Sequence, residues 1–482
     1  MNFKSDSVIS FIIVTTLSAL AQDKPVVPVT ASPAPTLATS AGLLNDWLRQ
    51  QADGFKILDV GGQVRLRYEV KDNMAVAGRA NSVDFSASSV DNDNDYFLTR
   101  EKFHIGLMPV DWFTIYGEGR HSSAAGDERV PSPDRDAIDL HQAYFTLGNV
   151  KHFPLTAKVG RQELAYGDER FIGASDWGNA GRVFDAAKLR YENADLWVDA
   201  FVSQVVMTRD QYFNEANHYD YFSGLYASTK TLIPKQETQF YFLARNVQSG
   251  SPTVIGAGQP PFLTGATSRD IYTIGARVKS LPGQFKGWDY EAELAGQFGR
   301  FQNLSHEAFA AHVAGGYTWS KVWGTPRAGL EYNYASGDDN STDGSHGTFE
   351  NLFPTNHKFY GFMDFVSLQN IHDVRVATSL KPLNKLTMTA DYHAFWLADT
   401  HDAFYQVNGA ARSSGGYGIK PGAGSYVGSE VDIVATYAIK PYAGVQAGYG
   451  HFFIGDYVKD TLATSGGSHD ANWVYAQTTF NF

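Results

Sequence analysis

Two features are missing from this chain of 482 residues, and each absence excludes a class of protein. Cysteine does not occur, which excludes disulfide bonds, thiolate nucleophiles and cysteine-ligated metals. After the N-terminus, no apolar run approaches the roughly 20 residues that a spanning helix needs. A helical membrane protein is therefore excluded, although 43% of the residues are hydrophobic.

Positive charge is also in deficit, with 39 Lys and Arg against 51 Asp and Glu and a formal net charge of −12. This balance argues against nucleic acid as a partner. What the sequence holds in quantity is aromatic residues, at 14%, and 46 glycines. Such a composition suits strands, tight turns and aromatic bands at membrane surfaces.

The N-terminus has the pattern of an export signal. Lys4 precedes an apolar stretch from Val8 to Leu20, and Ala19-Leu20-Ala21 has the small-x-small form of a cleavage site. We expect a signal peptide over residues 1–21; the alternative is a short buried segment. Residues 22–54 are rich in Pro and Ala and are expected to form a periplasmic N-terminal segment.

From about residue 55 to residue 482 the hydrophobic period changes to two, in segments of roughly 10 to 14 residues, the length of a tilted membrane strand. Residues 61–70 place Arg65 and Arg67 on one face and Leu66 and Tyr68 on the other. Residues 288–298 and 327–334 alternate in the same way. A barrel in a membrane predicts this pattern, with apolar residues toward lipid and polar residues toward the lumen.

Short and long connections alternate along the same region, which a soluble β-sandwich has no need to show. We predict tight turns near 110–112, 149–154, 193, 232–235, 281–286, 320–322, 382–384 and 441. Longer connections lie near 71–93, 123–137, 164–181, 207–220, 249–267, 337–370, 398–426 and 454–470, and one near 301–305 is short. The fold class is therefore all-β, a transmembrane antiparallel up-and-down barrel of about 18 strands whose short turns face the periplasm.

The last strand supports export to the outer membrane of a Gram-negative-type bacterium. Its alternate positions carry Val474, Ala476, Thr478, Phe480 and the terminal Phe482. A terminal aromatic residue on an amphipathic strand resembles the signal that outer-membrane assembly machinery reads.

Several stretches of the sequence resemble the alginate-export family of outer-membrane barrels. They are Leu98-Thr99-Arg100-Glu101, Gly160-Arg161-Gln162-Glu163-Leu164, Tyr166-Gly167-Asp168-Glu169-Arg170, Asp176-Trp177, Gly181-Arg182-Val183-Phe184-Asp185, Ser336-Gly337-Asp338-Asp339 and Phe353-Pro354-Thr355-Asn356-His357-Lys358. The resemblance implies an 18-stranded barrel that acts as a monomer. It also implies passive export of an acidic exopolysaccharide through a positively charged constriction, beside a synthase and a periplasmic export scaffold.

The alternation places many cations on the lumen face, where they would form the substrate pathway. The predicted pathway residues are Arg65, Arg67, Arg100, Lys102, Arg120, Lys158, Arg161, Lys188, Arg190, Arg277, Arg327 and Arg375. Arginine binds carboxylates through a two-pronged fork, so an anionic polysaccharide or a small polar solute would suit this lumen. Acids share the face, among them Asp289, Glu291, Glu293 and Glu331, and could instead pair with these cations structurally.

The sequence is also compatible with other functions. An uptake porin for sugars or organic acids would have the same barrel, because transport direction is not recorded in a pore sequence. A purely structural barrel is a further alternative. A membrane-embedded hydrolase could use His104, His141, His312 or His393, but no catalytic signature accompanies them. We expect no enzyme activity and no cofactor.

One loop has the spacing of a calcium-binding loop. Asp339, Ser341, Asp343 and Glu350 occupy positions 1, 3, 5 and 12 of that pattern. His346 stands where an apolar residue is usual, and strands rather than helices are expected on both sides. The two interpretations are a structural calcium ion and a solvated acidic loop.

Overall fold

The computed structural model describes residues 42–74, 85, 92–130, 132–254, 261–266, 268–412, 418–462 and 469–482. All elements of these ranges belong to one compact unit, Pro35–Phe482. The predicted signal peptide and residues 22–41 of the predicted periplasmic segment lie outside the described residues. In the part of the chain that is described, no helix is long and apolar enough to cross a membrane.

Eighteen strands form a closed antiparallel barrel, as the hydrophobic period predicts. Nine precede residue 250: β1 (Leu58–Asp72), β2 (Asn94–Val110), β3 (Phe113–Ala125), β4 (Asp136–Leu147), β5 (Leu155–Gln162), β6 (Phe184–Glu192), β7 (Leu196–Met207), β8 (Glu215–Thr229) and β9 (Gln236–Val247). The others are β12 (Arg269–Ser280), β13 (Trp288–Phe301), β14 (Leu304–Thr318), β15 (Arg327–Ala335), β17 (Ile371–Leu383), β18 (Leu386–Leu397), β19 (Tyr426–Lys440), β20 (Ala443–Ile454) and β21 (Ala471–Asn481).

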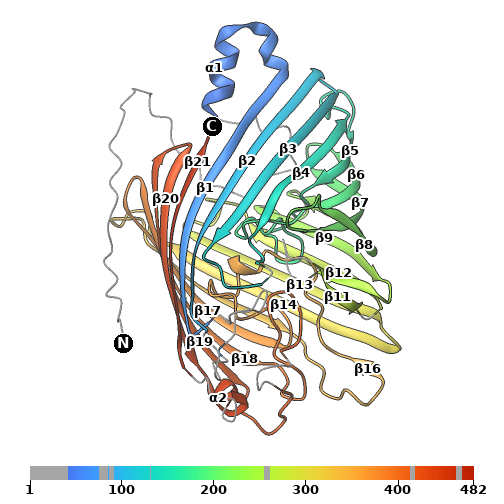
Figure 1. Cartoon of the computed structure of the whole chain (residues 1–482), viewed down its shortest axis with the longest axis vertical. Coiled ribbons are helices and arrows are strands. Elements are labelled where there is room, and N and C mark those ends of the chain that lie inside the picture. The colour runs from blue at the N-terminus through green and yellow to red at the C-terminus, as the bar shows by residue number, and fades with distance from the viewer. Residues whose placement is uncertain are drawn as a thin grey trace. The chain divides into compact units, whose positions relative to one another are not determined.

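Each strand pairs with its neighbours in the chain, and the first and last strands close the sheet (Figure 1). In that closing pair Gln63 of β1 lies opposite Asn481 of β21. The barrel therefore has no free edge strand, which in a membrane would leave backbone groups unpaired. The predicted fold class is confirmed.

Side chains alternate between the two faces of the wall. Arg65, Arg67 and Glu69 of β1 are buried inside, whereas Tyr68 and Val70 are exposed outside. Large apolar residues on the outer face include Phe103, Ile105, Val202, Leu225, Leu294, Val313 and Leu330. This exposed apolar face is the surface that lipid covers in a barrel of this kind.

The predicted asymmetry of the connections is also found. Residues 111–112, 148–154, 193–195, 230–235, 281–287, 319–326, 384–385 and 441–442 make the short turns at one end of the barrel. The helix α1 (Leu43–Gln51) and the 3-10 helix η1 (Asp53–Ile57) lie at this same end, just before β1 (Figure 1). Asn45 holds α1 to the strand, because its side-chain oxygen accepts a hydrogen bond from the Val60 N–H at 2.7 Å.

Two of the long connections turn inward and meet inside the barrel. We call residues 163–183, between β5 and β6, loop A, and residues 336–370, between β15 and β17, loop B. Loop B holds the two-residue strand β16 (Ser345–His346) and the 3-10 helix η2 (Asn356–Lys358). The Gly173 N–H donates to the Phe353 carbonyl at 2.8 Å, and the Phe353 N–H donates to the Phe171 carbonyl at 2.9 Å.

The interior core is built around these two loops. Tyr166, Phe171 and Ile172 of loop A pack with Phe349 and Phe353 of loop B. The cluster extends to lumen-facing rings of the wall, Phe184, Phe201 and Phe222. Burial of these apolar side chains gives the loops a fixed position, because the hydrophobic effect scales with the apolar area removed from water.

Two smaller elements complete the chain. The hairpin β10 (Ser251–Val254) and β11 (Pro261–Ala266) forms a separate two-stranded sheet between β9 and β12. The helix α2 (Asp456–Leu462) follows β20 and buries Tyr457, Val458 and Leu462.

Loop B is attached to the wall at a glycine that has little tolerance for a side chain. Gly361 has φ +86°, and a Cβ added there would lie 2.5 Å from Oε2 of Glu430 on β19. The Phe362 and Met363 N–H groups donate to Asp432 and Glu430 at 3.2 and 2.8 Å. The close approach at Gly361 lets the two wall carboxylates accept these backbone bonds.

We therefore expect Gly361→Ala to detach this part of loop B and to speed its cleavage in limited proteolysis of the folded barrel. Gly344→Ala is the matched control, since Gly344 also has a positive φ, +88°, but has open space around it. An alanine at either position has a left-handed backbone conformation, which costs roughly 1–2 kcal/mol. Only at position 361 does the added Cβ also clash with the Glu430 carboxylate. Equal cleavage of the two variants would contradict this account.

Candidate functional site

Two cations of β1 hold the tip of loop A against one side of the wall. Arg65 donates to the carbonyls of Asp176 and Gly178 at 2.8 and 3.2 Å. Arg67 donates to the Trp177 carbonyl at 2.9 Å, and its guanidinium lies over the Trp177 ring, 4.0 Å from its centroid. Three successive carbonyl groups of the loop therefore receive donors from the wall.

The side chain of Asp176 is held by a second pair of cations, Arg100 and Lys102 of β2, which we call the β2 clamp. The two terminal nitrogens of Arg100 lie 2.9 and 3.2 Å from the two carboxylate oxygens, and Lys102 Nζ lies 3.1 Å from Oδ1. The Asp176 side chain is 57% exposed to the lumen, but the protein around it reduces its hydration, which alone would raise its pKa. Lys102, Arg100 and Arg65 outweigh this effect and hold the pKa of Asp176 well below its usual range. The carboxylate therefore stays ionised at neutral pH.

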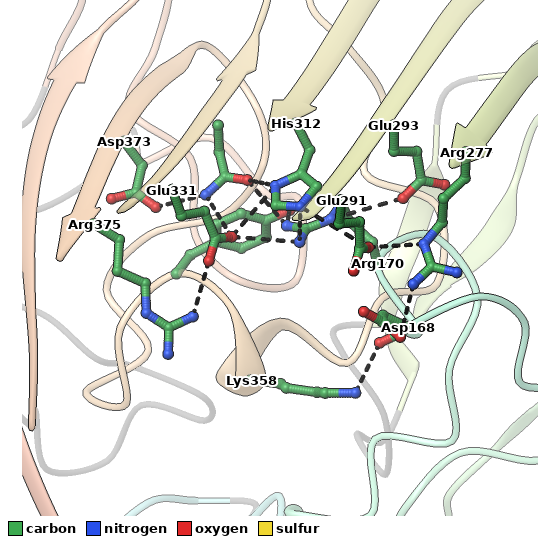
Figure 2. A network of polar contacts seen from close by, with 12 residues as sticks. Asp168, Arg170, Arg277, Glu291, Glu293, His312, Glu331, Lys358, Asp373 and Arg375 are labelled. Carbon is green, nitrogen blue, oxygen red and sulfur yellow. Dashed lines mark hydrogen bonds and ion pairs between the residues drawn. The ribbon is translucent and has the colours of Figure 1, made fainter. Parts of the chain in front are cut away.

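An equivalent clamp lies on β12, where Arg277 and Lys279 hold a second carboxylate of loop A, Asp168. Figure 2 shows the contact between Arg277 and Asp168. Arg277 Nη2 and Lys279 Nζ each lie 2.9 Å from an Asp168 oxygen. Arg277 and Lys279 also contact Glu291 of β13, at 2.7 and 3.3 Å. Burial would raise the pKa of Asp168, and the neighbouring cations, Arg277 first, hold it well below its usual value.

Lys358 of loop B belongs to the same region as the β12 clamp (Figure 2). Its ammonium group donates to the main-chain carbonyl of Asp168 at 3.0 Å, and the side chain is exposed. Lys279 is also accessible, with 40% of its side chain exposed. Two lysines next to Asp168 are thus accessible from the lumen.

Arg170 of loop A lies at the centre of a polar network that spans the wall from β13 to β15 (Figure 2). It donates to Asn333 Oδ1 at 3.0 Å and to the Tyr360 hydroxyl at 3.1 Å. It also lies 3.4 Å from Glu331 and 3.8 Å from Glu293. Because this guanidinium is buried, the carboxylates around it are needed to offset the loss of hydration.

Arg182 joins the two loops to each other. Its Nη1 donates to the carbonyls of Gly173, Phe353 and Pro354 at 3.0, 2.5 and 2.9 Å. The first carbonyl belongs to loop A and the other two to loop B. One buried guanidinium thus holds both segments together.

The remaining predicted pathway residues are distributed around the wall, and most have an acidic partner. Arg120 pairs with Asp136, Lys188 and Arg190 with Asp199, Arg327 with Asp289, and Arg375 with Glu331 and Asp391. Lys158 differs, because its ammonium group lies over the Tyr144 ring, 3.6 Å from the centroid. Most of the predicted cations therefore contribute to internal ion pairs as well as to the charge of the lumen.

Arg161 is an exception, because the structure places it on the outer face. The register of β5 and β6 is unbroken, and Arg161 lies opposite Asp185. Both share a face with the outward residues Val159 and Leu189, whereas Lys158 and Lys188 point inward. Arg161 lies an odd number of positions from Lys158, so both cannot face the lumen. Its Nε donates to Asp185 Oδ1 at 2.8 Å, and its assignment to the lumen was wrong.

The four histidines considered for a hydrolase have structural partners. His141 lies 2.6 Å from Arg120, His312 lies 2.8 Å from Asn333, and His393 lies 2.9 Å from Asp373. His104 lies 3.7 Å from Asp59 and stacks on Tyr116.

The four predicted calcium ligands do not converge. Glu350 binds Arg245 and Arg269 at 2.7 and 3.0 Å, so its carboxylate is already engaged. Asp343 instead accepts hydrogen bonds from Ser345 at 2.6 and 2.8 Å in a local turn. Among the described residues, no three His, Asp or Glu side chains form a group that could hold a metal ion. The geometry therefore gives no support to the calcium-site interpretation, because the carboxylate at the last position of the pattern already neutralises two arginines.

Five residues of the site could not be recognised from the alternation of the strands: Asp168, Arg170, Asp176, Arg182 and Lys358. All five lie in loops, where the alternation rule gives no direction for a side chain. The sequence marks these residues only through their place in stretches that resemble the alginate-export family, such as Gly167-Asp168-Glu169-Arg170 and Asp176-Trp177.

A closed barrel with an apolar outer face and a polar, loop-constricted lumen defines an outer-membrane channel of a Gram-negative bacterium. Residues 56–472 match the alginate export family, and the chain belongs to that family. No curated protein matches the sequence. The family and the fold are those of channels, which are not enzymes.

Solved porins of Pseudomonas aeruginosa share the fold at low sequence identity. OpdQ matches with a TM-score of 0.56 and 12% identity, over 89% of this chain and 98% of that one. OccK2 (OpdF) in complex with glucuronate matches with a TM-score of 0.55 and 11% identity, over 88% and 98%. OccK11 (OpdR) matches with a TM-score of 0.51 and 13% identity, over 88% and 96%.

Proposed function

We propose that this channel carries a carboxylate-bearing saccharide, an alginate-like polyuronate, out of the cell by passive transport. One observation carries the proposal: the β2 clamp and the β12 clamp each already hold a carboxylate in the lumen. A site that binds the carboxylate of Asp176 or Asp168 has the donors that a uronate carboxylate needs. Membership of the alginate export family supports the same substrate class.

Transport would proceed by exchange between such sites. Arginine and lysine inside low-dielectric walls raise the local concentration of an anion. Weak contacts at several sites let the solute leave each one again. In this proposal Arg100, Lys102, Lys279 and Lys358 contact the solute, and Arg65, Arg67 and Arg170 position the loops that narrow the lumen.

The proposal also includes the surroundings of the channel. The barrel would act as a monomer in outer-membrane lipid, beside a periplasmic export scaffold that docks at the end carrying the short turns and α1.

A second candidate is uptake of small organic acids or sugars. Loops A and B occupy the lumen with a packed apolar core, and a small solute could pass beside them more readily than a polymer. One neighbour in fold, OccK2, was solved with glucuronate. Both candidates use the same carboxylate sites, and they differ in the length of solute that passes.

The test is ion selectivity and solute block of the purified protein in planar bilayers, with oligouronates of increasing length and neutral oligosaccharides. We expect anion selectivity and block by uronates but not by neutral sugars, weakened about tenfold or more by Arg100→Ala with Lys102→Ala, as loss of roughly 1.4 kcal/mol of binding predicts. Arg161→Ala is the matched control, because it removes a cation from the outer face. Cation selectivity, or block by neutral sugars alone, would refute a polyanion pathway.

Solute length separates export from uptake. In liposomes that contain the protein, an export channel should release oligouronates of many units. Release of the monomer alone would favour uptake of small acids.

A further inference from the structure

A pocket of about 720 Å³ opens on the outside of the barrel, away from the lumen site. It is lined by Tyr332 of β15, His372 and Val374 of β17, and Trp396 of β18. These side chains point outward, because their neighbours along the strands, Asn333, Asp373 and Arg375, belong to the lumen network. The pocket is a shallow, open hollow, and its volume lies within the roughly 300–1,000 Å³ that ligand sites usually measure.

The pocket lies at the end of the barrel opposite the short turns. Trp396 is next to the last residue of β18, and the lining continues into the connection to β19 with Asp399, Thr400 and His401. Since the short turns face the periplasm in such barrels, this end faces the cell exterior. The pocket therefore lies where the outer leaflet of the membrane meets water.

Its two halves differ in chemistry. The half on the strands continues the exposed apolar face, because Tyr332 and Val374 are neighbours of the outward residues Leu330 and Val376. The half on the loop is polar: the Asp399 carboxylate accepts from the His401 N–H at 2.7 Å, and the Thr400 hydroxyl donates to the Pro421 carbonyl at 3.2 Å. An apolar half on the strands and a polar half on the loop match an amphiphile whose hydrocarbon chain lies in the membrane.

The charges in the pocket restrict the head group of that amphiphile. Among the described residues that line it, none is Lys or Arg, and Asp399 contributes a carboxylate. A phosphate would meet an acid and no strong cation there. An aromatic ring with hydroxyl, imidazole and carboxylate groups beside it suits a sugar, which offers apolar ring faces and hydroxyl groups.

We propose that this pocket binds one outer-leaflet amphiphile with a neutral glycosyl head, stacked on Trp396 and hydrogen-bonded to Thr400 and His401. The observation behind it is independent of the solute that the lumen carries. Because the pocket is continuous with the face that lipid covers, its occupant comes from the membrane rather than from the pore.

The test is native mass spectrometry of the full chain in tetraethylene glycol monooctyl ether, titrated with n-dodecyl β-maltoside and, separately, with dodecylphosphocholine. We expect one saturable maltoside adduct per chain and about tenfold weaker binding of the phosphocholine, a difference of roughly 1.4 kcal/mol. Trp396→Ala should weaken the maltoside adduct about tenfold or more. Thr400→Ala with His401→Ala should weaken it as well, and these loop positions leave the strands intact.

Leu225→Ala is the matched control, because Leu225 lines a separate outward groove over β5 to β9 that is almost entirely apolar. Heat-modifiable electrophoretic mobility would show that each variant is a folded barrel. The proposal is overturned if no saturable one-to-one adduct forms, if dodecylphosphocholine binds equally well, or if Leu225→Ala weakens the adduct as much as the pocket variants do.

Discussion

Arg182→Ala is expected to raise the single-channel conductance several-fold and to reduce the discrimination between uronates and neutral sugars. The guanidinium of Arg182 donates to carbonyls of both inward loops and is buried. Its removal takes this donor from three carbonyl groups. The Phe353 carbonyl keeps the Gly173 N–H as a donor, and for the carbonyls of Gly173 and Pro354 a buried unsatisfied acceptor costs roughly 1–3 kcal/mol. Loops A and B then lose a contact that holds them together across the lumen.

The measurement is conductance in planar bilayers, with limited proteolysis of the folded barrel as a second readout of loop release. Arg182→Lys should give an intermediate result, because an ammonium group keeps the charge but cannot reproduce the planar fork of arginine. Arg161→Ala should behave like the unsubstituted channel, since Arg161 pairs with Asp185 on the outer face. An Arg182→Ala channel with unchanged conductance and unchanged cleavage would show that the loops stay in place without this residue.

The barrel itself could be predicted from the sequence because the membrane imposes a simple rule on each strand. Lipid on one side and water on the other give a period of two, so residues such as Arg65 and Tyr68 reveal their faces without knowledge of the tertiary structure. The short turns could be located for a related reason, since they interrupt that period at regular spacing. Arg161 lies three positions from Lys158, and this odd spacing places the two side chains on opposite faces of β5.

The constriction could not be predicted in the same way. Asp168, Asp176 and Arg182 lie in loop A, whose conformation depends on contacts with residues far away in the chain, such as Phe353 and Arg277. No local period records such contacts. The charge pattern of the wall does not show which cations are accessible to a solute, because a cation such as Arg65 has backbone carbonyls of loop A as partners. Loop contacts therefore decide which lumen cations face the solute.

Asp176→Asn is expected to change the charge of the constriction without moving loop A. The main-chain carbonyl of residue 176 would still accept from Arg65 and Arg100, at 2.8 and 2.9 Å in the present structure. Asparagine has nearly the same shape as aspartate, so loop A should stay in place and the conductance should change little. The change removes one negative charge beside Arg65, Arg100 and Lys102.

We therefore expect the anion-to-cation permeability ratio of Asp176→Asn to rise several-fold and oligouronates to block about tenfold more tightly, since the side chain no longer competes for the β2 clamp. Reversal potentials under a salt gradient and titrations of block measure the two effects. Asp289→Asn is the matched control, because Asp289 pairs with Arg327 on the wall and does not belong to either loop. It should shift selectivity less and leave uronate block nearly unchanged. A fall in anion permeability, or weaker block in Asp176→Asn, would mean that Asp176 assists the passage of the solute rather than occupying its binding site.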